Sequence, residues 1–156
     1  MSGKTIYTAD DGDSPGQKSI GEFFDMATKA AAKGTAYFGY GRVSDKEAQR
    51  IKTDVGLDVN GASRFINEQY IRHAMAEHGE HGEYRNGQLP ITKKDIENIP
   101  EYVRTADTIS LEGKTIQGMN VIRYQKRVNG YVVVLEECRK RNKVLDFKTM
   151  WKYEAG

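Results

Sequence analysis

The spacing of apolar and polar residues changes along the chain and separates a helical first part from a strand-rich last part. From residue 120 onward the period is two, which predicts three strands, at residues 120–127, 131–139 and 143–152. Asn129-Gly130 is a typical hairpin sequence, and residues 140–142 form the second turn. The pattern therefore predicts an antiparallel sheet built from consecutive strands.

Helix signals precede this sheet. Ser19 with Glu22 and Ser44 with Glu47 match the capping box, and predict helices over residues 20–33 and 44–55. Two glycines follow these segments directly, which is the usual way for a helix to end. They are Gly34 and Gly56.

The segments between and after these helices also have clear signals. Residues 35–43 are rich in aromatic side chains and predict a strand, whereas residues 64–78 carry the apolar stripe of a helix. Thr92 and Asp95 form another capping box before a short helix that Pro100 ends or follows. The expected fold class is α+β, with N-terminal helices packed on a small antiparallel β-sheet.

A length of 156 residues fits one domain with a sizeable core. Residues 1–34 are interpreted as a tether, rich in Asp, Gly, Ser and Pro, followed by an accessory helix, and residues 35–156 as the main domain. The N-terminus lacks the apolar core of a signal peptide, and no apolar run approaches membrane-spanning length. We expect a soluble domain that does not bind membranes.

Net charge and cysteine content exclude only a few kinds of function and site. There are 24 Lys and Arg and 22 Asp and Glu residues, so the net charge of +2 permits nucleic-acid binding without arguing for it. The single cysteine, Cys138, excludes a disulfide framework and a zinc site built on several thiolates.

The predicted hairpin register identifies a polar corner on the sheet. If Asn129-Gly130 is a two-residue turn, Lys126 pairs with Val133, which in turn pairs with Thr149. In this register one face of the sheet is apolar, and must therefore be covered, except at three side chains. These are Tyr124, Lys126 and Thr149. The row formed by Lys126, Val133 and Thr149 either lies at the rim of the sheet, where the lysine side chain reaches water, or forms a shallow phosphate site.

All three histidines lie within residues 71–83. His73 and His78 are five residues apart, about 140° around a helix, so they cannot chelate one ion, and no metal site is expected. Each can be structural: His78 before Gly79 complements the helix dipole, and His73 and His81 suit the surface. Alternatively an imidazole facing the polar corner has the parts for metal-free cleavage of RNA.

Several motifs occur in an order typical of a known group: RHAMAEHGEHGE, then ITKKDIENIP, then YQKRVNG, then KTMWK. Over about residues 35–152 the chain resembles the phage-associated nucleases of the barnase/EndoU/colicin/RelE-like superfamily. The resemblance implies helices on an antiparallel sheet of four or five strands. It also implies a metal-independent ribonuclease without a cofactor.

The resemblance further implies a biological setting. Such domains are toxic C-terminal modules of larger phage or secreted proteins, delivered into the cytoplasm of a target cell. The expected partners are RNA and a cognate immunity protein that covers the active face. The rival interpretations are a non-catalytic nucleic-acid-binding or phage structural module, and a nuclease of the same fold that acts on DNA.

The motifs also assign candidate residues. His73 and His78 match the two motif histidines, and one of them is expected to act as base or acid. Glu83 matches the acidic position that follows. Lys126 is expected to neutralise the phosphate, and the hydroxyls of Tyr124 and Thr149 to donate hydrogen bonds to it.

The remaining assignments concern a carboxylate and three cations. Glu137 is predicted to orient a histidine or to serve as a base. The side chains expected to contact RNA are Arg72, Arg123 and Lys152. In the predicted register Lys152 points away from the polar corner.

Overall fold

The computed structural model describes residues 6–8, 19–29, 36–79 and 88–154. Within these ranges it has five helices: α1 (Ile20–Ala27), α2 (Asp45–Val55), α3 (Glu68–His78), α4 (Lys93–Glu97) and α5 (Ile99–Arg104). It has eight strands: β1 (Ile6–Thr8), β2 (Tyr37–Arg42), β3 (Ser63–Asn67), β4 (Gln88–Leu89), β5 (Thr108–Lys114), β6 (Asn120–Val128), β7 (Gly130–Arg139) and β8 (Val144–Tyr153). The α+β class is confirmed.

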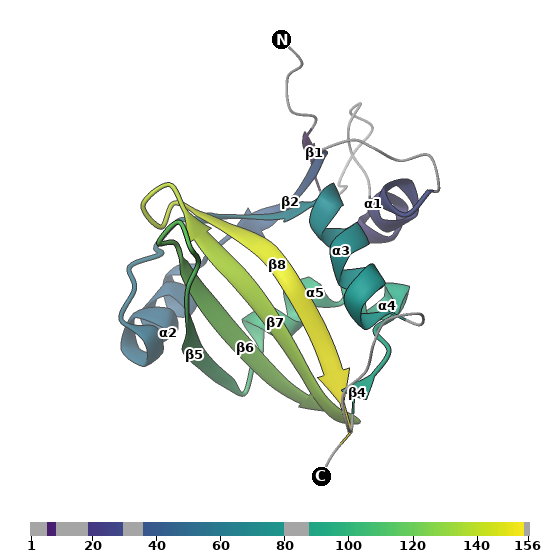
Figure 1. Cartoon of the computed structure of the whole chain (residues 1–156). Coiled ribbons are helices and arrows are strands. Elements are labelled where there is room, and N and C mark those ends of the chain that lie inside the picture. The colour runs from purple at the N-terminus through teal and green to yellow at the C-terminus, as the bar shows by residue number, and fades with distance from the viewer. Residues whose placement is uncertain (1–5, 9–18, 30–35, 80–87, 155–156) are drawn as a thin grey trace.

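The strands form one mixed sheet in the order β1-β2-β3-β8-β7-β6-β5, and β4 pairs with the far end of β8. β1 is parallel to β2 and β3 is parallel to β8, whereas the other pairs are antiparallel. The prediction of a small, purely antiparallel sheet is therefore wrong. The three strands predicted from the period-two pattern are confirmed as β6, β7 and β8 (Figure 1).

β3 accounts for part of the difference. Residues 64–67 were expected to begin a helix, but together with Ser63 they alternate between buried and partly exposed positions as a strand does. Arg64 and Ile66 point into the protein from this strand. α3 then begins at Glu68, where the Asn67 side chain accepts a hydrogen bond from the Gln69 backbone N–H at 2.8 Å.

The helix starts predicted from the three capping boxes are confirmed. Ser19, Ser44 and Thr92 each accept a hydrogen bond from the third helical N–H in a complete capping box. α2 ends as expected at Gly56, which has a φ of 85°. α1 ends at Ala27 instead of residue 33; the predicted stop at Gly34 lies outside the described residues.

The N-terminal segment contributes to the same structure. Ile6–Thr8, within the predicted tether, forms β1 and extends the sheet beside β2. Phe23 and Ala27 of α1 are fully buried in the main hydrophobic core. The domain division at residue 34 stays a prediction.

The hairpin between β6 and β7 differs from its predicted register by one residue. Val128 pairs with Gly130 and Lys126 pairs with Val132, because only Asn129 lies at the tip. Since side chains alternate across a strand, a shift of one residue moves each predicted partner to the opposite side of the sheet. The predicted row through Lys126, Val133 and Thr149 is therefore wrong.

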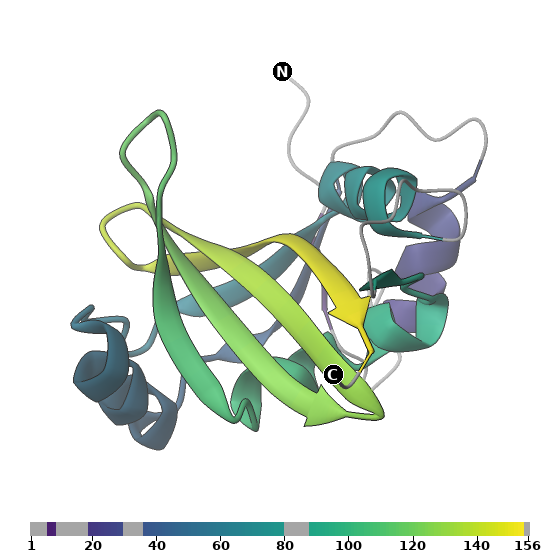
Figure 2. The ribbon, with the colours of Figure 1, turned by 60° about the horizontal axis from the view of Figure 1, so that its bottom comes forward.

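The sheet has two unlike sides. α2 and α5 pack against one, which we call the helix side, while α1, α3 and α4 pack together beside β8 (Figures 1 and 2). None of the described helices lies over the other side of β6–β8, which we call the outer side. No described helix is long and apolar enough to span a lipid bilayer.

Candidate functional site

The predicted site residues are divided between the two sides of the sheet. Tyr124 is buried on the helix side, and Lys126 on the same side donates a hydrogen bond to the Thr105 carbonyl oxygen at 3.2 Å. Thr149 and Glu137 lie on the outer side, opposite the residues with which they were expected to form one corner. The structure thus brings together only part of the predicted set.

Lys152 is placed differently from its prediction. Lys152 and Lys126 both pair with Val132, so Lys152 lies on the helix side, the same side as Lys126. Its ammonium group is 2.9 Å from the carboxylate of Asp95 at the start of α4. This contact joins the end of β8 to the helix beside it.

The two described histidines occupy unlike places on α3. His73 is 66% exposed and pairs with Glu77 one turn along the same helix, at 2.8 Å. His78 is partly buried at the C-terminal end of α3, and its ring lies 5.8 Å from that of Trp151 on the outer side. His81 and Glu83 lie outside the described residues.

The two predicted RNA-binding arginines also separate. Arg72 donates hydrogen bonds to Glu68 at 2.7 Å and to the Ala27 carbonyl oxygen at 3.2 Å, so it joins α3 to α1. Arg123 lies on the outer side of β6, where its guanidinium is 3.5 Å from Glu112. Only Arg123 of this pair therefore lies on the same side as Glu137.

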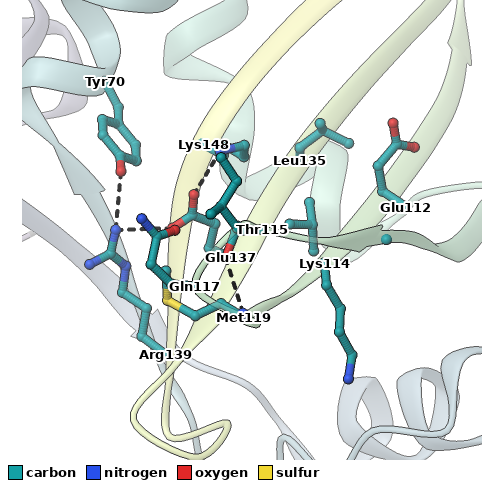
Figure 3. A pocket seen from close by; sticks show the side chains of 13 residues that line it. Tyr70, Glu112, Lys114, Thr115, Gln117, Met119, Leu135, Glu137, Arg139 and Lys148 are labelled. Atoms are coloured by element: carbon teal, nitrogen blue, oxygen red, sulfur yellow. Dashed lines mark hydrogen bonds and ion pairs between the residues drawn. The ribbon is translucent and has the colours of Figure 1, made fainter.

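A cleft of about 710 Å³ opens on the outer side, between the β5–β6 hairpin and the N-terminal half of α3. Glu137 from the central strand β7 lies at its base and is only 2% exposed. Its carboxylate accepts hydrogen bonds from Lys148 at 2.8 Å and from Arg139 at 2.9 Å (Figure 3). A carboxylate is thus held between two cations at the surface of a cleft.

Tyr70 completes this group. Its hydroxyl oxygen accepts a hydrogen bond from Arg139 at 3.1 Å, which leaves the phenolic hydrogen to be donated elsewhere (Figure 3). Although burial opposes the charge of Arg139, Asp146 and Glu137 raise the pKa of this guanidinium above its ordinary value. Arg139 therefore remains a cation at any pH at which the protein is folded.

A β-bulge places Lys148 in the cleft. Leu135 pairs with Thr149 but Glu136 pairs with Phe147, so Lys148 is an extra residue in β8. A bulge changes the direction of a side chain, and here Lys148 reaches Glu137 on the outer side. The neighbouring Thr149 hydroxyl is buried and has no hydrogen-bond partner within the described part of the chain.

The sequence interpretation singled out Glu137 and Thr149 but missed the three residues that surround them. Tyr70 lies within the helix predicted over residues 64–78 and Lys148 within the strand predicted over residues 143–152, and neither was given a role. Glu137 and Arg139 are two residues apart in a strand, so they share a side, and this spacing was the available signal. The bulge that adds Lys148 has no comparable signal in the sequence.

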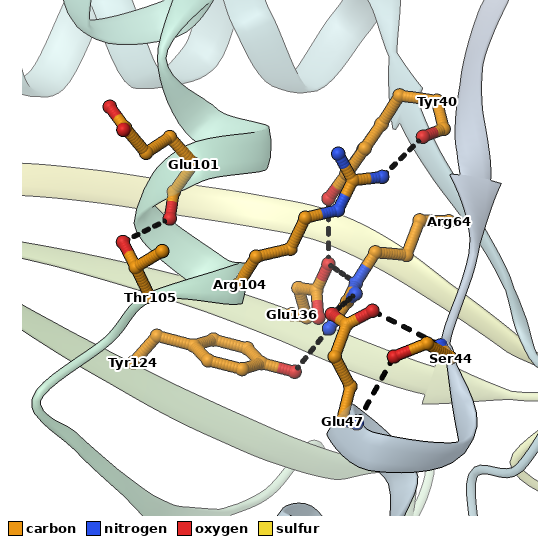
Figure 4. Close-up of polar contacts among 9 residues, drawn as sticks. All are labelled: Tyr40, Ser44, Glu47, Arg64, Glu101, Arg104, Thr105, Tyr124 and Glu136. Carbon is orange, nitrogen blue, oxygen red and sulfur yellow. Dashed lines mark hydrogen bonds and ion pairs between the residues drawn. The ribbon is translucent and has the colours of Figure 1, made fainter.

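A second polar cluster lies on the helix side, behind the cleft. Arg64 and Glu136 are both fully buried, and the Arg64 Nε is 3.3 Å from the Glu136 carboxylate (Figure 4). Arg64 also pairs with Glu47, and Tyr40 donates a hydrogen bond to Glu136 at 2.8 Å. Burial, and next the charge of Glu136, hold the pKa of the Tyr40 hydroxyl well above its usual value.

Burial raises the pKa of the Cys138 thiol to about 12, and the charge of Glu136 acts in the same direction. We expect native Cys138 to resist a disulfide reagent at pH 8, because roughly one thiol in 10⁴ is ionised there. Unfolding in urea is expected to make it react at once. Rapid labelling of the folded protein would contradict this placement.

The same pKa predicts a dependence of stability on pH. Folding keeps the Cys138 thiol neutral, whereas the thiol of the unfolded chain ionises from about pH 8.5. Above that pH, ionisation of the thiol stabilises the unfolded state but not the folded state. The free energy of unfolding therefore falls as the pH approaches 12. Urea titrations of the protein and of Cys138→Ala at several alkaline pH values measure this contribution.

Within the described residues, no three His, Cys, Asp or Glu side chains are grouped so as to hold a metal ion. The group at the base of the cleft consists of the Glu137 carboxylate, the basic side chains of Lys148 and Arg139, and the Tyr70 phenol; Glu112 and Lys114 line the cleft from β5. Such a group can bind an anion through its cations and can exchange protons through its carboxylate and hydroxyls.

Comparison with known proteins identifies the family. A family model described as phage-Barnase-EndoU-ColicinE5/D-RelE like nuclease3 matches residues 41–156. The matched residues include α3 and all of β5–β8, and therefore the whole Glu137 cleft. The resemblance drawn from the motifs is confirmed. No curated protein and no solved structure matches the chain.

Proposed function

The chain belongs to this phage-associated nuclease family, and from that premise we propose that it is a metal-independent endoribonuclease whose active site is the outer cleft. One observation carries the proposal: Glu137 is held between Lys148 and Arg139 in a cleft that can admit a phosphodiester. RNA supplies the 2′-hydroxyl that can act as an internal nucleophile, whereas DNA lacks it.

The roles follow from charge and position. The incoming phosphate competes with Glu137 for Lys148 and Arg139, and so frees the carboxylate to act as a base. Glu137 takes the proton of the 2′-hydroxyl, the 2′-oxygen forms a bond to phosphorus, and the bond to the 5′-oxygen breaks. The products are a 2′,3′-cyclic phosphate and a 5′-hydroxyl. Tyr70 and Thr149 donate hydrogen bonds to the phosphoryl oxygens.

The leaving 5′-oxygen needs a proton, and we assign this role to His78. The His78 ring lies beside Trp151 on the outer side. Along β8, Trp151 is farther than Thr149 from the position that pairs with Glu137. A base and an acid on either side of the Thr149 hydroxyl suit an in-line displacement, in which the entering and leaving oxygens lie on opposite sides of phosphorus. His73 pairs with Glu77 at the helix surface and has no part in this arrangement.

The test is cleavage of end-labelled RNA in the presence of EDTA. The protein is expected to cut RNA with the chelator present and to leave DNA of the same sequence intact. His78→Ala is expected to lower the rate about 100-fold, because a positioned acid contributes on that order. His73→Ala is the matched control and should cut like the unmodified protein.

Three results would overturn the assignment. Cleavage that EDTA abolishes would require a metal ion, and equal cleavage of DNA would remove the 2′-hydroxyl from the mechanism. Retention of RNA binding without cleavage by freshly folded protein would favour a non-catalytic nucleic-acid-binding module.

The family also supports a proposal about setting. We propose that the domain acts as a toxin in the cytoplasm of a target cell, carried there by a larger phage or secreted protein. A cognate immunity protein would inhibit it by covering the outer side, where a partner can block the cleft directly. Co-expression that restores growth of cells producing this domain would identify such a partner.

A further inference from the structure

Beyond the cleft, the outer side of β6–β8 carries two groups of stacked planar side chains. Arg127, Tyr131 and Tyr153 form one row across the three strands. The two tyrosine rings are stacked at 5.3 Å, and the Arg127 guanidinium lies 5.7 Å from the Tyr131 ring centre. All three side chains are at least partly exposed.

The second group centres on Trp151, in the next outer row of β8. The Arg123 guanidinium lies 5.6 Å from the Trp151 ring centre, and the His78 ring lies 5.8 Å from it. Below these rings are buried aliphatic side chains, Val133 among them, which fix the height of the tryptophan above the sheet. The Arg123 guanidinium pairs with Glu112 at 3.5 Å.

The two groups continue directly from the catalytic cleft. Outer-side residues of β7 follow one another as Glu137, Leu135, Val133 and Tyr131. At the strand rise of about 3.3 Å per residue, the Trp151 row lies roughly 13 Å and the Tyr131 row roughly 20 Å from Glu137. A nucleic-acid strand whose phosphate occupies the cleft therefore reaches both groups within several nucleotides.

We propose that these two groups form a stacking surface for unpaired bases, so that the substrate is a single-stranded RNA segment lying along β7. This inference rests on the proposed ribonuclease function and specifies its substrate. Aromatic rings and guanidinium planes stack on bases of any sequence, and in a duplex those base faces are not available. The arginines add attraction for the phosphates beside the stacked bases.

The chain offers a direct probe because Trp151 is its only tryptophan. The experiment titrates the full chain with a 12-nucleotide 2′-O-methyl RNA, which cannot undergo the cleavage reaction. We expect saturable quenching of the Trp151 fluorescence by the single strand. The same strand annealed to its complement should quench little or not at all.

Three variants distinguish a loss of base stacking from a loss of folding. Tyr131→Leu is expected to weaken binding about 5- to 150-fold, whereas Tyr131→Phe keeps the ring and should bind like the unmodified protein. Arg127→Gln, at an exposed position that cannot disturb the core, should weaken binding several-fold. Circular dichroism confirms that each variant is folded.

The outcomes distinguish this inference from the proposed function. Quenching and its loss in Tyr131→Leu support the stacking surface even if unmodified RNA is not cut, a result that would refute only the ribonuclease. Cleavage without quenching would refute the stacking surface alone. Equal binding of single strand and duplex, or unchanged binding by Tyr131→Leu and Arg127→Gln, would also overturn it.

Discussion

Replacing Glu137 with glutamine is expected to lower kcat/KM for RNA cleavage by about 10²- to 10⁴-fold, the usual contribution of a general base. Glutamine has the same shape, but its one oxygen can accept from only one of Lys148 and Arg139, because these cations contact different oxygens of the carboxylate. Glutamine cannot take the proton of the 2′-hydroxyl. The loss should therefore appear in kcat, with a smaller change in KM.

A second glutamate of the same cleft provides the control. Glu112 lines the cleft from β5, but its side chain is 38% exposed and pairs with Arg123. Glu112→Gln has the same change of charge and should stay within a few-fold of the unmodified rate. Equal losses in the two variants would show that charge near the cleft matters and that neither carboxylate is the base. Full activity of Glu137→Gln would remove it from the mechanism.

Local signals in the sequence were enough to place most elements. A Ser or Thr followed three residues later by Glu or Asp satisfies backbone donors whatever the rest of the fold does, so the helix starts at Ser44 and Thr92 were predictable. The Asn129-Gly130 pair likewise located the hairpin between β6 and β7. These contacts join residues that are close in sequence.

Long-range pairing was not predictable in the same way. β3 lies antiparallel to β2 and parallel to β8, which is about 80 residues farther along, and these pairings make residues 64–67 part of a strand instead of the start of a helix. The sequence therefore did not predict that Arg64 and Glu136 form an ion pair in the core. Neither residue carries a local signal of the other.

The site was misplaced by small shifts in pairing. One residue of hairpin register and one extra residue at Lys148 decide which side chains share a side of the sheet. Of the residues singled out in the sequence, Glu137, Thr149 and His78 border the outer side. The motif resemblance could not say that Tyr124 and Lys126 lie on the other side.

The largest expected effect on stability comes from separating Arg64 from Glu136. Arg64→Met leaves Glu136 fully buried without its cation, although the Tyr40 hydroxyl still donates a hydrogen bond to the carboxylate. Removing one partner of a buried ion pair typically costs about 3–5 kcal/mol. Burial disfavours the charged guanidinium, but Glu136 together with the neighbouring tyrosines and Glu47 outweighs burial and holds the pKa of Arg64 well above its ordinary value.

The double variant separates the ion pair from simple packing. Arg64→Met with Glu136→Leu removes both charges together, so it should be more stable than either single variant, with a coupling free energy of several kcal/mol. Urea unfolding followed by Trp151 fluorescence measures all three. The control is Arg50→Met, which breaks an exposed pair with Asp54 and should cost at most about 1 kcal/mol.

The cluster of Arg64 and Glu136 lies directly behind the proposed active site, so the same variants also test whether it affects RNA cleavage. Glu136 and Glu137 are neighbours on β7, and the strand alternation that buries the first aims the second into the cleft. The double variant should therefore keep RNA cleavage wherever it remains folded, because neutral side chains can hold the strand as well as charged ones. Additive losses of stability in the two single variants would show that Arg64 and Glu136 act independently in the core.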